Sequence, residues 1–151
     1  MTLRSFLCAL ALCAAAPGVS AADLVSKPSP HSVAETLDRL EAAVGNAGAT
    51  VFARVDHAKG AESVGSELAP AQMLMFGNPK LGTPAMQAAI TAGLDLPLRV
   101  LAYEDASGQV QVVYHDPAEL AATHNIAADA EVIKMMTGAL GKLTDAAVAT
   151  E

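Results

Sequence analysis

The sequence has no tryptophan, few other aromatic residues and only two cysteines. Aromatic residues make up 3% of the 151 residues, and Cys8 and Cys13 both lie near the start of the chain. Proteins that bind single-stranded nucleic acid stack its bases on aromatic side chains. The sequence offers too few rings for such a surface.

Positive charge is also scarce. Nine Lys and Arg residues stand against 16 Asp and Glu, so the formal net charge is −7 at pH 7. An acidic chain repels the phosphate backbone, and no cluster of basic residues offsets that repulsion. Nucleic acid is therefore excluded as a partner.

The first residues are typical of a secretory signal peptide. Arg4 is the only charged residue before Asp23, and the span 6–16 is almost entirely apolar. Small residues follow, and they fit a cleavage site after Ala21 or Ala22. The apolar run is too short to span a bilayer. We therefore predict a signal peptide at residues 1–21, a periplasmic or secreted location, and no membrane insertion after cleavage.

Both cysteines fall inside this predicted signal peptide. A lipoprotein signal needs a small residue directly before its cysteine, but Leu7 and Leu12 stand there. Cleavage would remove both thiols, and with them any disulfide, thiolate metal site or cysteine nucleophile. Removing 21 of the 151 residues leaves 130 residues with a net charge of −8, enough for a single domain over residues 22–151.

Hydrophobic periodicity predicts alternating helices and strands. Ser32 and Glu35 form a capping box ahead of a helix over residues 32–48. The alternation over residues 50–57 predicts a strand, with Val51, Ala53 and Val55 on one face. The remaining expectations are an edge strand in 23–30, a weak helix in 58–68, a strand at 72–76, a hairpin over 98–116 turning at 105–108, and helices from 117 and over 129–147. This order predicts an α+β fold, with a single antiparallel sheet and helices packed on one face.

The stretch LMFGNPKLGTPAMQAA, residues 74–89, raises the question of a phosphate-binding loop. Gly77 and Gly82 have the right spacing, but Thr83 stands where such a loop needs lysine. We therefore expect a strand that turns into a helix, with Thr83 as the N-cap and Pro84 as the first helical residue. Lys80 beside that helix N-terminus makes a small anion, such as a carboxylate, a candidate ligand.

Four short segments carry a family resemblance. They are Asp56-His57, the loop from Phe76 to Lys80, Gly82-Thr83-Pro84, and the segment from Asp95 to Leu98. Over roughly residues 26–124 the chain resembles the bacterial family known as domain of unknown function 302, which leaves the C-terminal helix as an extension. The resemblance implies a two-layer fold like that of the TATA-box-binding protein, together with a homodimeric assembly. It implies no activity.

No complete catalytic or metal-binding set appears in the sequence, so whether the protein is an enzyme stays open and no cofactor is predicted. The binding residues that we predict are Asp56, Asn78, Lys80 and Thr83. His57 is the candidate acid or base of a hydrolase or lyase, with Asp95 or Lys80 assisting it.

Periplasmic copper binding by Met73, Met75, Met86 and His57 is a further alternative. Met73 and Met75 share a face of their strand, and Met86 lies on the next helix. Thioether ligands suit cuprous copper, although methionines at core spacing usually belong to the core.

The leading hypothesis is an exported homodimer that binds a small ligand or a protein partner near residues 78–83. Because like charges repel, the two copies must associate through apolar surface. The candidate surfaces are the hairpin strands 98–103 and 110–114, or the C-terminal helix with Met135, Met136 and Leu140.

Overall fold

The computed structural model describes residues 24–150. The predicted signal peptide and its cleavage site lie outside the described residues. In chain order the elements are β1 (Leu24–Ser29), α1 (Val33–Asn46), β2 (Thr50–Asp56), α2 (His57–Glu62), β3 (Ala71–Gly77), α3 (Pro79–Ala88), the 3-10 helix η1 (Ile90–Leu94), β4 (Leu98–Glu104), β5 (Val110–His115), α4 (Pro117–Thr123) and α5 (Glu131–Val148).

The five strands form one antiparallel sheet in the order β1-β5-β4-β3-β2. Strands β2 to β5 lie next to one another in chain order. Strand β1, the first in the chain, pairs with β5 at the edge opposite β2. Pro28 lies in β1, an edge strand, where a residue without an N–H can be accommodated. The predicted α+β fold is confirmed.

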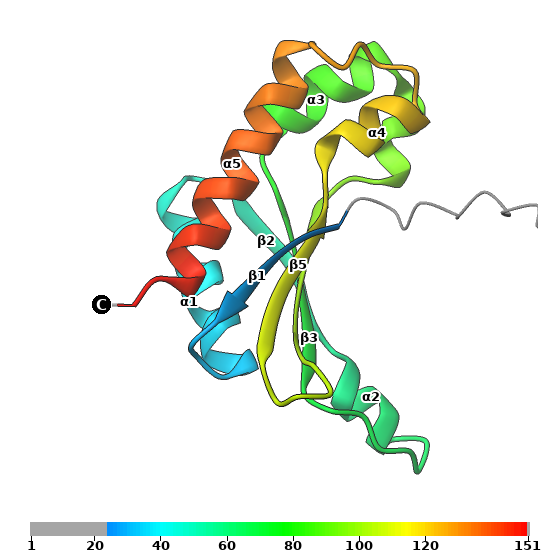
Figure 1. Cartoon of the computed structure of the whole chain (residues 1–151). Helices are drawn as coiled ribbons and strands as arrows, with labels where there is room; N and C mark the ends of the chain where they lie inside the picture. Colours follow the sequence, from blue (N-terminus) through cyan, green and yellow to red (C-terminus); the bar gives the residue numbers. More distant parts are fainter. Residues whose placement is uncertain (1–23, 151) are drawn as a thin grey trace, which may run out of the picture.

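Helices α1 and α5 lie side by side against one face of the sheet (Figure 1). The predicted stripe of α1 is buried, with Leu37, Leu40 and Val44 fully covered. The Ser32 hydroxyl accepts the Glu35 N–H at 3.2 Å, as the capping box predicts. On α5, Met136 and Leu140 are buried within the chain, so the expectation that these two form a dimer surface is wrong, whereas Met135 is 40% exposed.

The faces of β2 differ from the prediction because the strand contains a bulge. Val51 pairs with Phe76 and Ala53 pairs with Met75, which leaves Phe52 as an extra residue between them. Val51 therefore packs against the core, whereas Ala53 and the residues after it have changed face. An alternation pattern alone cannot reveal the extra residue.

The face of the sheet opposite α1 and α5 carries several apolar side chains. Along β3, Leu74 and Phe76 are buried, so Met73 and Met75 point to the opposite face of the sheet. Residues paired across strands share a face, so the partners of Met73 and Met75 lie on that opposite face as well. We call this surface the open face; its large side chains are Val55, Met73, Met75, Leu101, Tyr103 and Val113.

The buried apolar side chains form two clusters. The larger one lies between the sheet and helices α1 and α5. The smaller one joins α3, η1, α4 and the first half of α5, and it includes Ala85, Leu120 and Met136. Leu98 packs against both clusters, so it lies where the two meet.

Lys27 links the edge strand β1 to the C-terminal helix α5. The Lys27 ammonium donates to the Thr144 hydroxyl at 2.8 Å and to the Asp145 carboxylate at 2.6 Å. Such charge-assisted bonds are stronger than neutral ones. Helix α5 is therefore fixed to the sheet as well as buried against α1.

The turn between β4 and β5 is organised by Asp105. Its Oδ1 accepts from the Ser107 hydroxyl at 2.6 Å and from the Ser107 and Gln109 N–H groups. Its Oδ2 accepts from the Gln111 side chain at 3.2 Å. These bonds, above all the Ser107 hydroxyl, lower the pKa of Asp105 from 3.8 to about 2, because they favour the ionised form.

The pKa of Asp105 gives a test of this turn. Because the folded value lies below the unfolded one, the ionised carboxylate stabilises the hairpin above pH 3.8, and this stabilisation is lost as the pH falls toward about 2. We expect Ser107→Ala to raise the pKa, and carboxyl NMR titration measures it. Ser66→Ala, in a remote turn, is the control. A wild-type value near 3.8 would contradict the assignment.

Candidate functional site

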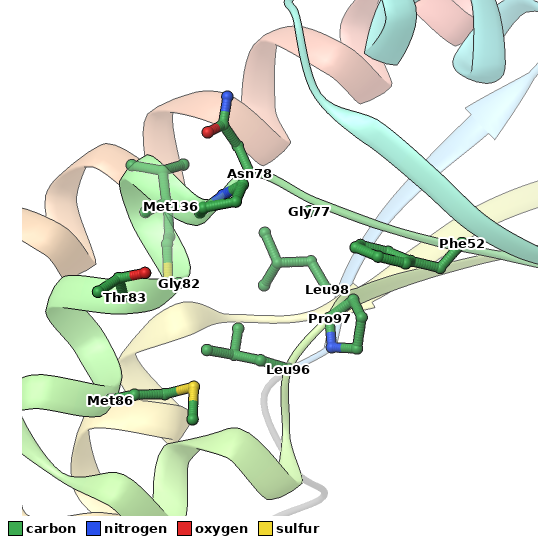
Figure 2. Close-up of a pocket in the computed structure, with 12 residues that line it drawn as sticks. Phe52, Gly77, Asn78, Gly82, Thr83, Met86, Leu96, Pro97, Leu98 and Met136 are labelled. Carbon is green, nitrogen blue, oxygen red and sulfur yellow. The ribbon is translucent and has the colours of Figure 1, made fainter.

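A cavity of about 240 Å³ opens between α3 and the segment that enters β4 (Figure 2). Its walls come from the β2 bulge, the end of β3, the first turns of α3, the segment 96–98 and α5. The large apolar side chains that line it are Phe52, Pro79, Leu81, Met86, Leu96, Pro97, Leu98 and Met136. The cavity therefore lies at the junction of the two apolar clusters.

Asn78 sets the direction in which the chain leaves the sheet. Its Oδ1 accepts the Lys80 N–H at 2.9 Å, so Asn78 is the N-cap of α3 and Pro79 is the first helical residue. Its Nδ2 donates to the Gly48 carbonyl at 3.1 Å, which fastens the helix start to the turn before β2. The expectation that Thr83 caps this helix is wrong, because Thr83 and Pro84 lie inside α3.

The backbone N–H groups at the start of α3 already have acceptors. The Lys80 N–H goes to the Asn78 side chain, and those of Leu81 and Gly82 go to the Asn78 carbonyl at 2.9 Å. An anion at this end of α3 would therefore rely on the exposed Lys80 ammonium. Anion binding by Lys80 stays a prediction, with less support than the sequence suggested.

Few polar groups face the cavity. In Figure 2 the Asn78 amide points away from the cavity, in agreement with its bond to Gly48. The Thr83 hydroxyl points from α3 toward the cavity. Of the four predicted binding residues, Asn78 and Thr83 line the cavity, whereas Lys80 neighbours it along α3 and Asp56 does not line it. The lining is thus mostly apolar.

His57 and Asp56 lie at the other end of the sheet. Thr50 pairs with Gly77, beside the cavity, but Asp56 pairs with Gln72. The two pairs are five residues apart along β3, about 17 Å at roughly 3.3 Å per residue. Asp56 caps α2 by accepting the Lys59 N–H at 3.0 Å. The structure therefore does not bring His57 together with Asn78 or Lys80.

The three methionines of the copper hypothesis are not grouped at the cavity. Met86 lines it, and its companion there is Met136. Met73 and Met75 belong to the open face, opposite the buried side of β3. Within residues 24–150, no group of three or more His, Cys, Asp or Glu side chains could hold a metal ion.

Asp95 has a partner that the sequence did not reveal. His124, directly after α4, donates or accepts through Nε2 at 2.7 Å from the Asp95 carboxylate, and its Nδ1 lies 2.9 Å from the Thr91 hydroxyl. The imidazole side chain is only 5% exposed. The two partners are 29 positions apart in the sequence, which explains why no short motif indicated the pair.

His124 contacts Thr91 on one side and Asp95 on the other, and in enzymes these three residue types can serve as base, nucleophile and orienting carboxylate. However, neither Thr91 nor His124 lines the cavity, and the imidazole is nearly covered. Asp95 also lies at a second cleft of about 280 Å³, together with Arg99, His115 and Glu119. These side chains are paired, since His115 contacts Glu119 at 3.0 Å and Arg99 contacts Asp95 at 3.4 Å.

The sequence profile of the family described as "Domain of unknown function DUF302" matches residues 25–143. The match continues past the resemblance noted in the sequence and takes in most of α5. A crystal structure of an uncharacterized conserved protein DUF302 from Bacillus stearothermophilus has a similar fold. Its TM-score is 0.76 at 20% identity, and the match covers 84% of this chain and 99% of that one.

Curated relatives carry the name of an ion channel. "Fluoride-specific ion channel FluC 1" from Brucella suis is 47% identical over 122 residues, which are 80% of this chain and 48% of the relative. The protein of the same name from Brucella abortus is also 47% identical, with 80% and 45% covered. The chain thus spans about half the length of these relatives. No helix within the described residues is long and apolar enough to cross a membrane.

Two alanine variants distinguish the observed N-cap from the predicted one. Asn78→Ala removes the bonds to Lys80 and Gly48, so we expect it to lower the free energy of unfolding by about 1 to 2 kcal/mol. Thr83→Ala changes an exposed position inside α3 and should cost less than about 0.5 kcal/mol. Urea unfolding measures both. The reverse ranking would show that Thr83 is the cap.

Proposed function

The chain belongs to the DUF302 family, whose description assigns no activity, and on that premise we propose that it is an exported domain that binds a small apolar molecule in the cavity beside α3. The observation that carries this proposal is the lining of the cavity. Eight large apolar side chains surround it, and Asn78 directs its amide elsewhere. Burial of an apolar ligand against such a surface is favourable because both surfaces leave water.

The size of the cavity limits the ligand. An apolar cavity of about 150 Å³ holds benzene in another protein. A cavity of about 240 Å³ therefore suits a molecule somewhat larger than benzene, such as a bicyclic ring or a short branched chain. Met86 and Met136 favour adaptable packing, because the thioether side chain fills irregular space. The Thr83 hydroxyl supplies one polar contact at the wall.

Binding of indole and naphthalene tests the proposal. Both should shift the backbone amide signals of Gly77, Gly82 and Leu98 and raise the melting temperature of the wild-type protein. Sodium acetate is the comparison ligand, since an anion site at Lys80 would respond to acetate and not to the apolar probes.

A glycine in α3 offers a variant that fills the cavity. A Cβ at Gly82 would lie 3.9 Å from the Leu96 side chain, an ordinary contact, so Gly82→Leu should enter the cavity and abolish indole binding. Gly138 in α5 has open space around its Cα, so Gly138→Leu is the matched control and should bind indole normally. Equal binding by both variants, or no binding by the wild type, would refute the proposal.

Export rests on the signal peptide predicted at residues 1–21. Expressed in a Gram-negative host, the protein should be recovered from the periplasm with a mass that begins near Ala22 or Asp23. A mass that retains Cys8 and Cys13 would contradict this proposal.

We also propose that the protein is a homodimer that pairs through the open face. An apolar sheet face can pack on a second sheet face, and two-fold dimers are the commonest oligomers. Arg99 lies near one end of the face, and Asp105 lies at the turn at the other end. If the strands of two copies run in opposite directions, the opposite charges meet while the apolar centres are buried.

Sedimentation of charge variants tests the dimer. Met73→Glu places a carboxylate in the open face and should give a monomer, because burying an unpaired charge is costly. Gln87→Glu adds the same charge at an exposed position of α3 and should leave the dimer intact. Added salt should favour the dimer, since it screens the repulsion between two acidic chains. A wild-type monomer at low and high salt would contradict the proposal.

The names of the curated relatives support a second candidate function, that of an accessory domain beside a fluoride channel. A pore must cross the membrane, and no helix within residues 24–150 is able to do so. We therefore assign the fluoride pathway of the relatives to the half that this chain does not match. In this proposal the chain modulates the channel and binds no fluoride itself.

Fluoride efflux measures the accessory function. In a host that lacks its own fluoride channel, co-expression of this chain with the channel half of the Brucella suis relative should change the efflux rate, compared with that half alone. The purified chain should show no amide shifts with fluoride. An unchanged efflux rate would refute the accessory function and leave the proposed apolar ligand untouched.

A further inference from the structure

We propose that His124 is a positioning residue for the ligand cavity: its buried imidazole holds the wall segment, residues 91–98, in the place that shapes the cavity. This inference rests on the proposed apolar ligand only for its effect on affinity. Its structural part concerns how one side chain fixes a segment that lines the cavity.

Both ring nitrogens of His124 hold the wall segment. Nε2 lies 2.7 Å from the Asp95 carboxylate, and Nδ1 lies 2.9 Å from the Thr91 hydroxyl. Thr91 is near the start of η1 and Asp95 directly follows its end. One imidazole therefore ties both ends of this short helix to the end of α4.

These contacts of His124 matter because the last three residues of the wall segment line the cavity. Leu96, Pro97 and Leu98 follow Asp95 and line the cavity. Asp95 also accepts from Arg99 at 3.4 Å, on the other side of these three residues. The position of the Asp95 carboxylate thus determines where the apolar wall begins and ends.

Burial makes this tie strong. The His124 side chain is 5% exposed, so water cannot readily replace either partner, although the Asp95 side chain is 40% exposed. A hydrogen bond to an ionised carboxylate is stronger than one between neutral groups. Without the imidazole, water can reach the Asp95 carboxylate and the Thr91 hydroxyl, so these groups would bond to water and no longer to the end of α4. Removal of the imidazole should therefore release the wall segment locally.

The chain contains a matched control for His124. His115 also contacts a carboxylate, that of Glu119 at 3.0 Å, but its side chain is 63% exposed and it does not line the cavity. His115→Leu therefore makes the same chemical change as His124→Leu but leaves the bonds of His124 to Thr91 and Asp95 in place.

Hydrogen exchange followed by NMR tests the structural part without any ligand. The N–H of Ala92 bonds to the Ala89 carbonyl at 3.0 Å, and that of Asp95 bonds to the Ala92 carbonyl at 3.1 Å. In His124→Leu both amides should exchange roughly tenfold faster or more, since a bond to a charged group is worth at least that factor in an equilibrium. The amide of Leu74 in β3 should keep its rate, as should all amides in His115→Leu.

Two milder variants keep the test interpretable if His124→Leu folds poorly. Thr91→Val removes only the contact to Nδ1, so it should accelerate the same two amides to a smaller extent. Asp95→Asn retains an oxygen that can accept from Nε2–H in a weaker, neutral bond, so the two amides should exchange more slowly than in His124→Leu and keep part of the protection. Acceleration in the first and protection in the second identify the hydrogen bonds as the cause.

Indole titration tests the effect on the cavity. The dissociation constant should rise about tenfold in His124→Leu and stay unchanged in His115→Leu. If the wild type binds no indole, the proposed ligand fails while the exchange result still decides the role of His124. Unchanged exchange at Ala92 and Asp95, or equal acceleration throughout the chain, would overturn the positioning role. Faster exchange with unchanged indole affinity would show that the wall segment does not control binding.

Discussion

The Asn78 side chain is the contact on which the arrangement of the site depends. Its oxygen caps α3 through the Lys80 N–H, and its nitrogen reaches the Gly48 carbonyl. One amide thus fixes where β3 stops, where α3 starts, and how both sit against the turn before β2. The β2 bulge then presents Phe52, which is 60% exposed, to the same place. A cavity forms here because the helix leaves the sheet at a fixed angle, with no large side chain at Gly77 or Gly82 to fill the space.

The two apolar clusters explain why the lining of this cavity is apolar. The larger cluster, between the sheet and helices α1 and α5, is formed by the apolar residues that alternate along the strands and by the apolar stripe of α1. The smaller cluster is formed where α3, η1, α4 and α5 pack together. Leu98 contacts both, and Met136 contributes to the second cluster and to the cavity. The cavity is therefore an incompletely filled junction between two cores. Polar groups around it are used elsewhere: the Asn78 amide at the turn, and the Asp95 carboxylate on His124.

Periodicity predicted most of the fold but only part of the site. The strands at 72–76 and 98–116 and the helix from 32 were correctly predicted, because their apolar residues repeat at 2 or 3.6 positions. The start of α3 was placed too late, since Asn78-Pro79 and Thr83-Pro84 carry the same cap signature. The earlier start lets Leu81 and Ala85, four residues apart, pack into the second cluster, so tertiary packing decided between two equal local signals. The contact between Asp95 and His124 spans 29 residues and depends on where α4 ends, which no local pattern encodes.

The cavity and the open face are neighbours, and Phe52 lies between them. The bulge removes Phe52 from the regular alternation of β2, so it lines the cavity, while Ala53 beyond it pairs with Met75 on the open face. A second copy seated on that face would cover the approach to Phe52, and a ligand that contacts Phe52 would stiffen the bulge. Each event therefore acts on the same residue. Thermodynamic linkage then requires that ligand binding and dimer formation affect one another by the same factor in both directions. If both proposals hold, the bulge connects the proposed ligand site with the proposed dimer interface.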